Sequence, residues 1–172
     1  MAKTPDLTIK QFMALLQDQS SEKGSRLLGL DLGTKTIGLA ISNSNWTIAS
    51  PVYTIRRQKF TLDVEELLAY ATKEKISGLV IGLPLNMDDS EGPRAQATRA
   101  FVRNMAKFTD LPVFFWDERL SSVVAEEQMF QASISKKKHS GQIDQRAAAI
   151  ILQGCLDHLR QELEAFRDGS MH

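Results

Sequence analysis

The pattern of apolar and polar residues predicts three strands in the first third of the chain. Residues 27–30 form a short, mostly apolar run that ends on Asp31, as in a buried strand. Residues 37–41 alternate between branched apolar and small side chains, which indicates a second strand. Residues 48–55 predict a third, and Pro51 favours an edge position because proline cannot donate to a ladder.

Helices and strands alternate in the rest of the chain. Asp63 precedes an apolar helical face and has Glu66 three residues later, the spacing of a capping box. Residues 78–82 are wholly apolar, as in a central parallel strand. The other predicted elements are a helix over 94–108, a strand over 111–116, and helices over 121–132 and 142–167. This order predicts an α/β domain with the ribonuclease H-like fold, whose five-stranded mixed sheet has three antiparallel and two parallel strands flanked by helices.

Residues 1–25 are interpreted as an extension of this domain, which then spans 26–168. Within the extension, residues 8–17 have the apolar spacing of a short amphipathic helix. The polar stretch after this helix is typical of a linker. The helix docks either on the domain or on a partner, and the sequence favours neither.

Composition narrows the class of protein without fixing it. The 172 residues suffice for one domain with a substantial core, and 42% hydrophobic and 24% charged residues are ordinary for a soluble globular protein. The formal net charge is zero, so any surface that binds nucleic acid must be local. The single Cys155 can form no internal disulfide, and no segment resembles a signal peptide or a membrane span. We therefore expect a cytoplasmic protein with no membrane partner.

Carboxylates stand at the ends of the predicted strands. Asp31 closes the first strand beside a Gly-Thr-Lys turn, where Gly33 lets the backbone bend sharply and a phosphate approach closely. Asp117 and Glu118 close the last strand, opposite another strand-end aspartate, and packing alone explains such acidic groups poorly. Two of the acidic residues also have a purely structural interpretation. Asp31 can cap a turn. Asp144, in the first turn of the last predicted helix, can compensate the helix dipole.

Basic residues gather at three places along the chain, and a phosphate backbone could follow the last two of them. They are Arg56, Arg57 and Lys59, then Arg99, Arg103 and Lys107 on one helix face, and finally Lys136, Lys137 and Lys138 in a loop before the last helix. A solvated surface is the alternative interpretation, because exposed lysine and arginine are the norm.

Five motifs between residues 26 and 159 resemble the YqgF/RuvX family and occur in that family's order. They are Leu-Gly-Leu-Asp-Leu-Gly-Thr-Lys-Thr-Ile-Gly-Leu-Ala, Val-Ile-Gly-Leu-Pro-Leu-Asn-Met-Asp, Ser-Glu-Gly-Pro-Arg-Ala, Asp-Glu-Arg-Leu-Ser-Ser and Ile-Asp-Gln-Arg-Ala-Ala-Ala. The resemblance implies a nuclease similar to Holliday junction resolvases, which requires a divalent metal and matures precursor ribosomal RNA in the cytoplasm. By position, Asp31, Glu118 and Asp144 match the family's acidic residues.

We expect these three carboxylates to converge and to hold two Mg²⁺ or Mn²⁺ ions, with Asp31 bridging both. One ion would activate a water molecule and the other would stabilise the leaving 3′-oxygen. The predicted nucleic-acid contacts are Gly33, Thr34, Lys35, Arg119, Lys136, Lys137 and Lys138. Asp117 is the alternative to Glu118 as second ligand, because the strand over 78–82 ends without an acidic residue.

Two other functions fit the same residues. Asp-Leu-Gly-Thr also resembles the first phosphate loop of the actin and sugar-kinase superfamily, although those proteins use two domains and a second Asp-x-Gly loop. A non-catalytic nucleic-acid or ribosome-assembly factor could retain the same fold. Structured RNA and branched DNA are alternative substrates, cut internally or from an end, and the sequence favours no oligomeric state.

Overall fold

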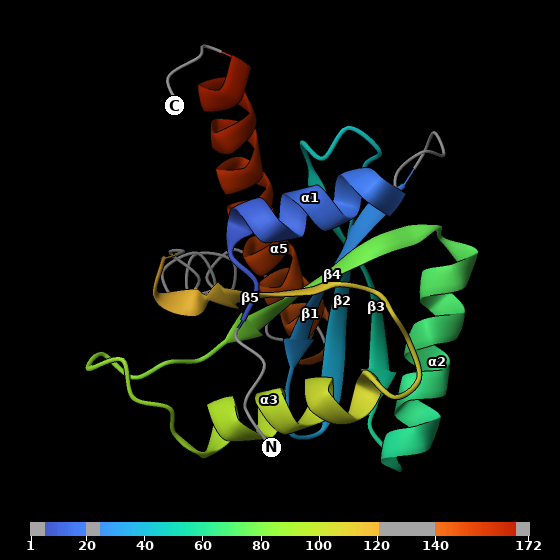
Figure 1. Cartoon of the computed structure of the whole chain (residues 1–172). Helices are drawn as coiled ribbons and strands as arrows, with labels where there is room; N and C mark the ends of the chain where they lie inside the picture. The colour runs from blue at the N-terminus through green and yellow to red at the C-terminus, as the bar shows by residue number, and fades with distance from the viewer. Residues whose placement is uncertain (1–5, 20–24, 121–139, 168–172) are drawn as a thin grey trace.

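The computed structural model contains one five-stranded mixed sheet within the residues that it describes (Figure 1). It describes residues 6–19, 25–120 and 140–167, with the backbone alone at 18, 19, 140–144 and 166. The strands are β1 (Arg26–Leu32), β2 (Thr36–Ser42), β3 (Ala49–Arg56), β4 (Ile76–Leu83) and β5 (Val113–Asp117). The helices are α1 (Ile9–Gln19), α2 (Phe60–Lys73), α3 (Pro93–Met105), the short 3-10 helix η1 (Glu118–Leu120) and α5 (Ser140–Arg167).

The strand order β3-β2-β1-β4-β5 places β1 at the centre of the sheet. β1 and β3 pair antiparallel with β2, whereas β4 pairs parallel with both β1 and β5. This confirms the predicted ribonuclease H-like sheet of three antiparallel and two parallel strands. β3 lies at an edge, as predicted from Pro51, and its register with β2 shifts between Leu39 and Ala40, where Ala40 pairs with this proline.

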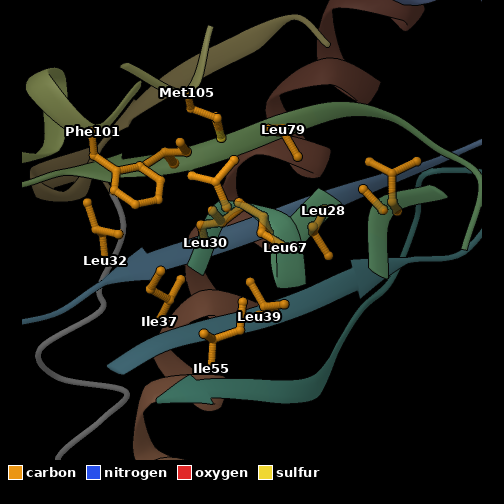
Figure 2. Packing of buried hydrophobic residues seen from close by; sticks show 14 of the residues in the cluster. Leu28, Leu30, Leu32, Ile37, Leu39, Ile55, Leu67, Leu79, Phe101 and Met105 are labelled. Carbon is orange, nitrogen blue, oxygen red and sulfur yellow. The ribbon is translucent and has the colours of Figure 1, made fainter. Parts of the chain in front are cut away.

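Helices cover both faces of the sheet and bury two separate apolar clusters. On one face, α1 and α5 pack over Leu27 of β1 and Val80 of β4. On the other face, Leu67 of α2 and Phe101 and Met105 of α3 lie against alternate side chains of the strands (Figure 2). Because strand side chains alternate between faces, the odd-numbered positions of β1 face α5.

Helix α1 docks on the domain at the start of β4. Phe12 and Leu16 are fully buried, and both would contact a Cβ built on Gly78. The ring of Phe12 also stacks on Phe114 of β5, with the two ring centroids 5.4 Å apart. Of the two alternatives for the extension, the structure therefore shows docking on the domain.

The start of α2 differs from the prediction. The helix begins at Phe60 after an N-cap at Lys59, because the ring of Phe60 packs edge-on against Phe101 with centroids 5.2 Å apart. The capping-box interpretation of Asp63 was therefore wrong. Asp63 is buried inside the first turn, where its Oδ1 accepts a hydrogen bond from the N–H of Gln58 at 2.9 Å.

Two other helix boundaries differ slightly from the prediction. Helix α3 ends at Met105 instead of residue 108, because a tight turn follows in which the N–H of Phe108 donates to the Met105 carbonyl at 2.9 Å. Helix α5 begins at Ser140, two residues early. The predicted helix over 121–132 lies outside the described residues. None of the helices in the described ranges is long and apolar enough to cross a bilayer.

Candidate active site

The carboxyl ends of β1 and β4 meet at one edge of the sheet because these two strands are parallel. Leu30 of β1 pairs with Ile81 of β4, and the same register sets the next residues, Asp31 and Gly82, side by side. Both positions face α5. A Cβ built on Gly82 would lie 2.6 Å from Cδ1 of Ile151, and Asp31 follows Gly29, which packs against Leu152, by two residues. Asp31 is thus a half-buried carboxylate beneath α5.

Glu118 reaches the same edge from the neighbouring strand. It follows β5 directly and opens the turn η1. A Cβ on Gly82 would lie 2.5 Å from Oε1 of Glu118 and 3.2 Å from its Cγ, so this side chain occupies the space that a larger residue at 82 would need. The structure therefore brings Asp31 and Glu118 to adjacent positions on one face. It also shows why position 82 of β4 is a glycine rather than an acidic residue.

Asp117, the alternative to Glu118, points to the opposite face. Trp116 before it packs against Gly154 of α5, and successive strand residues alternate between faces. The carboxylate of Asp117 instead accepts from Nη2 of Arg119 at 2.8 Å, and this hydrogen bond lowers the pKa of Asp117. Geometry thus places Glu118 beside Asp31 and keeps Asp117 away.

Helix α5 packs across β1, β2 and β3 (Figure 1), and one side-chain contact locates its start. Nε2 of Gln145 donates to Oγ1 of Thr54 at 2.8 Å, and Thr54 pairs through Gly38 with Asp31. The backbone of Asp144 therefore lies near this edge, whereas its side chain lies outside the described residues. Among the side chains that are described, no group of three or more His, Cys, Asp or Glu could hold a metal ion.

The turn after Asp31 is tight. The N–H of Gly33 donates to the carbonyl of Thr36 at 2.9 Å, and a Cβ at Gly33 would lie 3.0 Å from that oxygen, so glycine suits the turn best. Between these residues, Thr34 and Lys35 are exposed. The turn thus presents a hydroxyl and an ammonium group to solvent, three and four residues after Asp31.

Comparison with known proteins assigns the chain to a family. Residues 25–158 match the family described as RuvX: Holliday junction resolvase. The chain belongs to the RuvX family. A Rhodobacter capsulatus protein named "Putative pre-16S rRNA nuclease" is 56% identical over 133 residues, covering 77% of this chain and 84% of that protein. A Rhizobium etli protein of the same name is 52% identical over 153 residues, covering 89% of this chain and 90% of that protein.

Solved structures show a more distant likeness to this RuvX chain. RuvC from T. thermophilus in complex with a Holliday junction substrate is 11% identical, with a TM-score of 0.47, covering 81% of this chain and 96% of that one. The fowlpox virus Holliday junction resolvase is 13% identical, with a TM-score of 0.44, covering 79% and 98%. Identities and TM-scores this low assign no role to individual residues of this RuvX protein.

Arg119, a predicted phosphate contact of this RuvX chain, is engaged within the protein. Besides Asp117 it contacts Asp89 through Nη1 at 2.7 Å and donates to the carbonyl of Asn86 at 2.9 Å. The two carboxylates raise the pKa of Arg119, Asp117 more than Asp89. Its charge is thus largely balanced, and it ties η1 to the loop after β4. The other predicted contacts, Lys136, Lys137 and Lys138, lie outside the described residues.

Sequence reasoning missed two arginines beside the site of this RuvX protein. Arg57 donates from Nη1 to the carbonyl of Gly33 at 2.7 Å, and Arg94 donates from Nη2 to the carbonyl of Leu32 at 3.3 Å. These carbonyls belong to the first two residues after Asp31. Arg94 belongs to the motif Ser-Glu-Gly-Pro-Arg-Ala, but the motif alone assigned it no contact, and Arg57 was placed in a solvated basic cluster. The hydrogen-bond partners of both arginines are distant along the chain, so local patterns did not show them.

Proposed function

We propose that this chain is a metal-dependent nuclease that hydrolyses phosphodiester bonds in precursor 16S ribosomal RNA. The proposal is carried by the placement of Asp31 and Glu118 side by side, over Gly82, at the carboxyl edge of the sheet. Membership of the RuvX family supports the nuclease reaction. The names of the relatives at 51–56% identity support the RNA substrate.

The donor groups suit divalent cations. Carboxylate oxygens are the ligands that Mg²⁺ and Mn²⁺ favour, and two adjacent carboxylates repel each other unless a cation balances them. We propose that Asp31, Glu118 and Asp144 would together hold two such ions. Ions bound there supply a more acidic water and offset negative charge on the leaving 3′-oxygen.

Basic side chains of the protein position the substrate. Lys35, exposed in the turn that follows Asp31, holds the phosphate backbone by charge. Binding of this kind weakens with added salt and distinguishes sequences poorly. Lys136, Lys137 and Lys138 precede α5 and remain predicted phosphate contacts. We also propose a cytoplasmic location, in keeping with a single, buried, free cysteine, Cys155.

The decisive experiment offers the purified protein a precursor 16S rRNA fragment, a four-way DNA junction and ATP, each with Mn²⁺ or Mg²⁺. We expect cleavage of the RNA, its loss on chelation, and its loss in Asp31→Asn. The matched control is Glu74→Gln, which removes a carboxylate that contacts Arg26 at 3.3 Å at the opposite end of β1. This control is expected to retain cleavage.

The other outcomes separate the alternatives. Cleavage of the junction but not the RNA would assign branched DNA as the substrate. Hydrolysis of ATP without cleavage of a polynucleotide would favour the kinase-like alternative, and RNA binding without cleavage would favour an assembly factor. Cleavage that survives Asp31→Asn would overturn the proposed site.

A further inference from the structure

Arg57 holds both ends of the exposed loop that follows Asp31. Its Nη1 donates to the carbonyl of Gly33 at 2.7 Å, before the loop. Its backbone N–H donates to the carbonyl of Lys35 at 2.9 Å, at the end of the loop. One residue directly after β3 therefore contacts both ends of the span that contains Thr34 and Lys35.

The guanidinium of Arg57 is committed inside the protein. Its side chain is 29% exposed, its Nε lies 3.8 Å from Oδ2 of Asp63, and its Cζ lies 5.7 Å from the ring centroid of Phe101. Asp63 is only 2% exposed, and among the described residues its Oδ2 has no hydrogen-bond partner. A buried carboxylate is costly unless a cation balances it, so Arg57 and Asp63 hold each other in place.

Lys35 has the opposite surroundings. It is exposed, and within the described part of the chain no carboxylate forms an ion pair with it. Its ammonium is therefore available to a phosphate, whereas the guanidinium of Arg57 is not. The direction that Lys35 takes depends on the turn that Arg57 holds.

We propose that Arg57, balanced by Asp63, is a positioning residue that fixes the Gly33–Lys35 turn so that Lys35 meets a substrate phosphate next to Asp31. The inference rests on the proposed nuclease function and adds to it the residue that orients its phosphate contact. It also divides the basic cluster at residues 56–59, because Arg57 acts within the fold while Arg56 and Lys59 are exposed.

The test is a double-mutant cycle on RNA binding. Asp31→Asn protein serves as the parent so that bound RNA stays intact, and Mn²⁺ is present throughout. Fluorescence anisotropy measures the Kd of a labelled precursor 16S rRNA fragment, over about 50–200 mM salt, for Lys35→Gln, Arg57→Gln and the double variant. Arg26→Gln is the matched control, since it breaks the ion pair with Glu74 at the other end of β1.

We expect Lys35→Gln to weaken binding roughly tenfold and to reduce the salt slope by about one, as for one lost phosphate contact. Arg57→Gln should produce the same two changes, and the double variant should be no weaker than the weaker single variant, because Arg57 acts through Lys35. Arg26→Gln should leave Kd and slope unchanged. Additive losses in the double variant, or an unchanged Kd in Arg57→Gln, would overturn the inference.

A second measurement guards against loss of the fold. Thermal unfolding identifies variants that remain folded at the assay temperature, and amide hydrogen exchange then reports the turn itself. We expect exchange at Thr34 and Lys35 to accelerate at least about tenfold in Arg57→Gln and to stay unchanged in Arg26→Gln. Equal protection in Arg57→Gln and the parent contradicts the proposal. Should Arg57→Gln unfold, Asp63→Asn takes its place with the same expectations.

Failure of this inference is distinguishable from failure of the proposed function. In the cleavage assay, Arg57→Gln should raise KM with kcat within about twofold, whereas partial unfolding lowers kcat and leaves KM unchanged. A parent protein that binds no RNA at any salt concentration overturns the proposed substrate and this inference together. A parent that binds RNA equally well with and without Lys35 and Arg57 overturns the inference alone.

Discussion

Two glycines of β4, Gly78 and Gly82, show how differently the two ends of the sheet are built. Both face the side that α1 and α5 cover. At Gly78, a Cβ would lie 2.7 Å from Cδ2 of Leu16 and 3.0 Å from Cζ of Phe12, both fully buried. At Gly82, the nearest atom is Oε1 of Glu118 at 2.5 Å. The space of the missing side chain is thus filled by hydrocarbon alone at Gly78, and by a carboxylate together with Cδ1 of Ile151 at Gly82.

The two ends differ in whether folding stability alone explains the residues found there. Burial of a large apolar side chain contributes about 1.5–3 kcal/mol, so Phe12 and Leu16 account for the end at Gly78. A carboxylate beside a second carboxylate gains no such energy and is repelled. Apolar burial therefore does not explain the arrangement of Glu118 and Asp31 over Gly82, and substitutions at the two ends should have different effects.

The largest effect is expected from Glu118→Gln, which keeps the shape over Gly82 and removes the charge. We expect kcat/KM for cleavage of precursor rRNA to fall roughly 10²–10³-fold, as when an enzyme loses one group that stabilises transition-state charge. Asp117→Asn is the matched control, and its kcat/KM should change by less than about threefold because it removes only an ion pair near the surface. Comparable losses in both variants would return Asp117 to the site.

The end at Gly78 should respond in stability rather than in catalysis. Phe12→Ala leaves a cavity between α1 and β5, and we expect the free energy of unfolding to fall by about 3 kcal/mol. Leu15→Ala on the same helix is the control, because Leu15 is 39% exposed and should cost less than about 1 kcal/mol. Urea unfolding measures both. The rate of cleavage per folded molecule should not change, and a tenfold fall in it would contradict the separation of the two ends.

Adding one methyl group at each glycine compares the two ends directly. In Gly82→Ala the clash falls on the flexible end of Glu118 and on Cδ1 of Ile151. Because Glu118 must move, we expect cleavage to fall roughly tenfold, part of the loss in Glu118→Gln. In Gly78→Ala the clash falls on Leu16 and Phe12, and we expect a loss of about 1–3 kcal/mol in stability with normal cleavage. Cleavage rates and urea unfolding of both variants provide the measurement. The same changes in cleavage rate and in stability for Gly82→Ala and Gly78→Ala would refute the proposed difference between the two ends.

The sequence predicted the strands and the position of the first carboxylate for a simple physical reason. Residues 27–30 and 78–82 are apolar runs of strand length, and parallel strands end at the same edge, so Asp31 at a strand end could be placed near the end of its neighbour. Local patterning was sufficient there because burial on both faces leaves few alternatives.

The remaining features depend on contacts that no local pattern encodes. The choice between Asp117 and Glu118 required knowing that Trp116 faces α5, which fixes the face of each following residue. The pairing of Arg57 with Asp63 follows from the early start of α2, which depends on tertiary packing of Phe60. Propensity and capping rules yield to such packing, which is why the capping-box prediction for Asp63 failed.

The smallest effect is a pH dependence confined to the polar end. The hydrogen bond from Arg119 lowers the pKa of Asp117, so its stabilisation is fully present above the unfolded-state pKa of 3.8 and is lost as pH falls through the folded value. Urea unfolding should show Asp117→Asn less stable than wild type by no more than about 1 kcal/mol at neutral pH, and equally stable below that range. Arg119→Gln should reduce the same pH dependence, since Asp117 then keeps only the backbone N–H of residue 119 as a donor, at 3.0 Å. A difference between Asp117→Asn and wild type that persisted in acid would show that the residue acts by shape instead of charge.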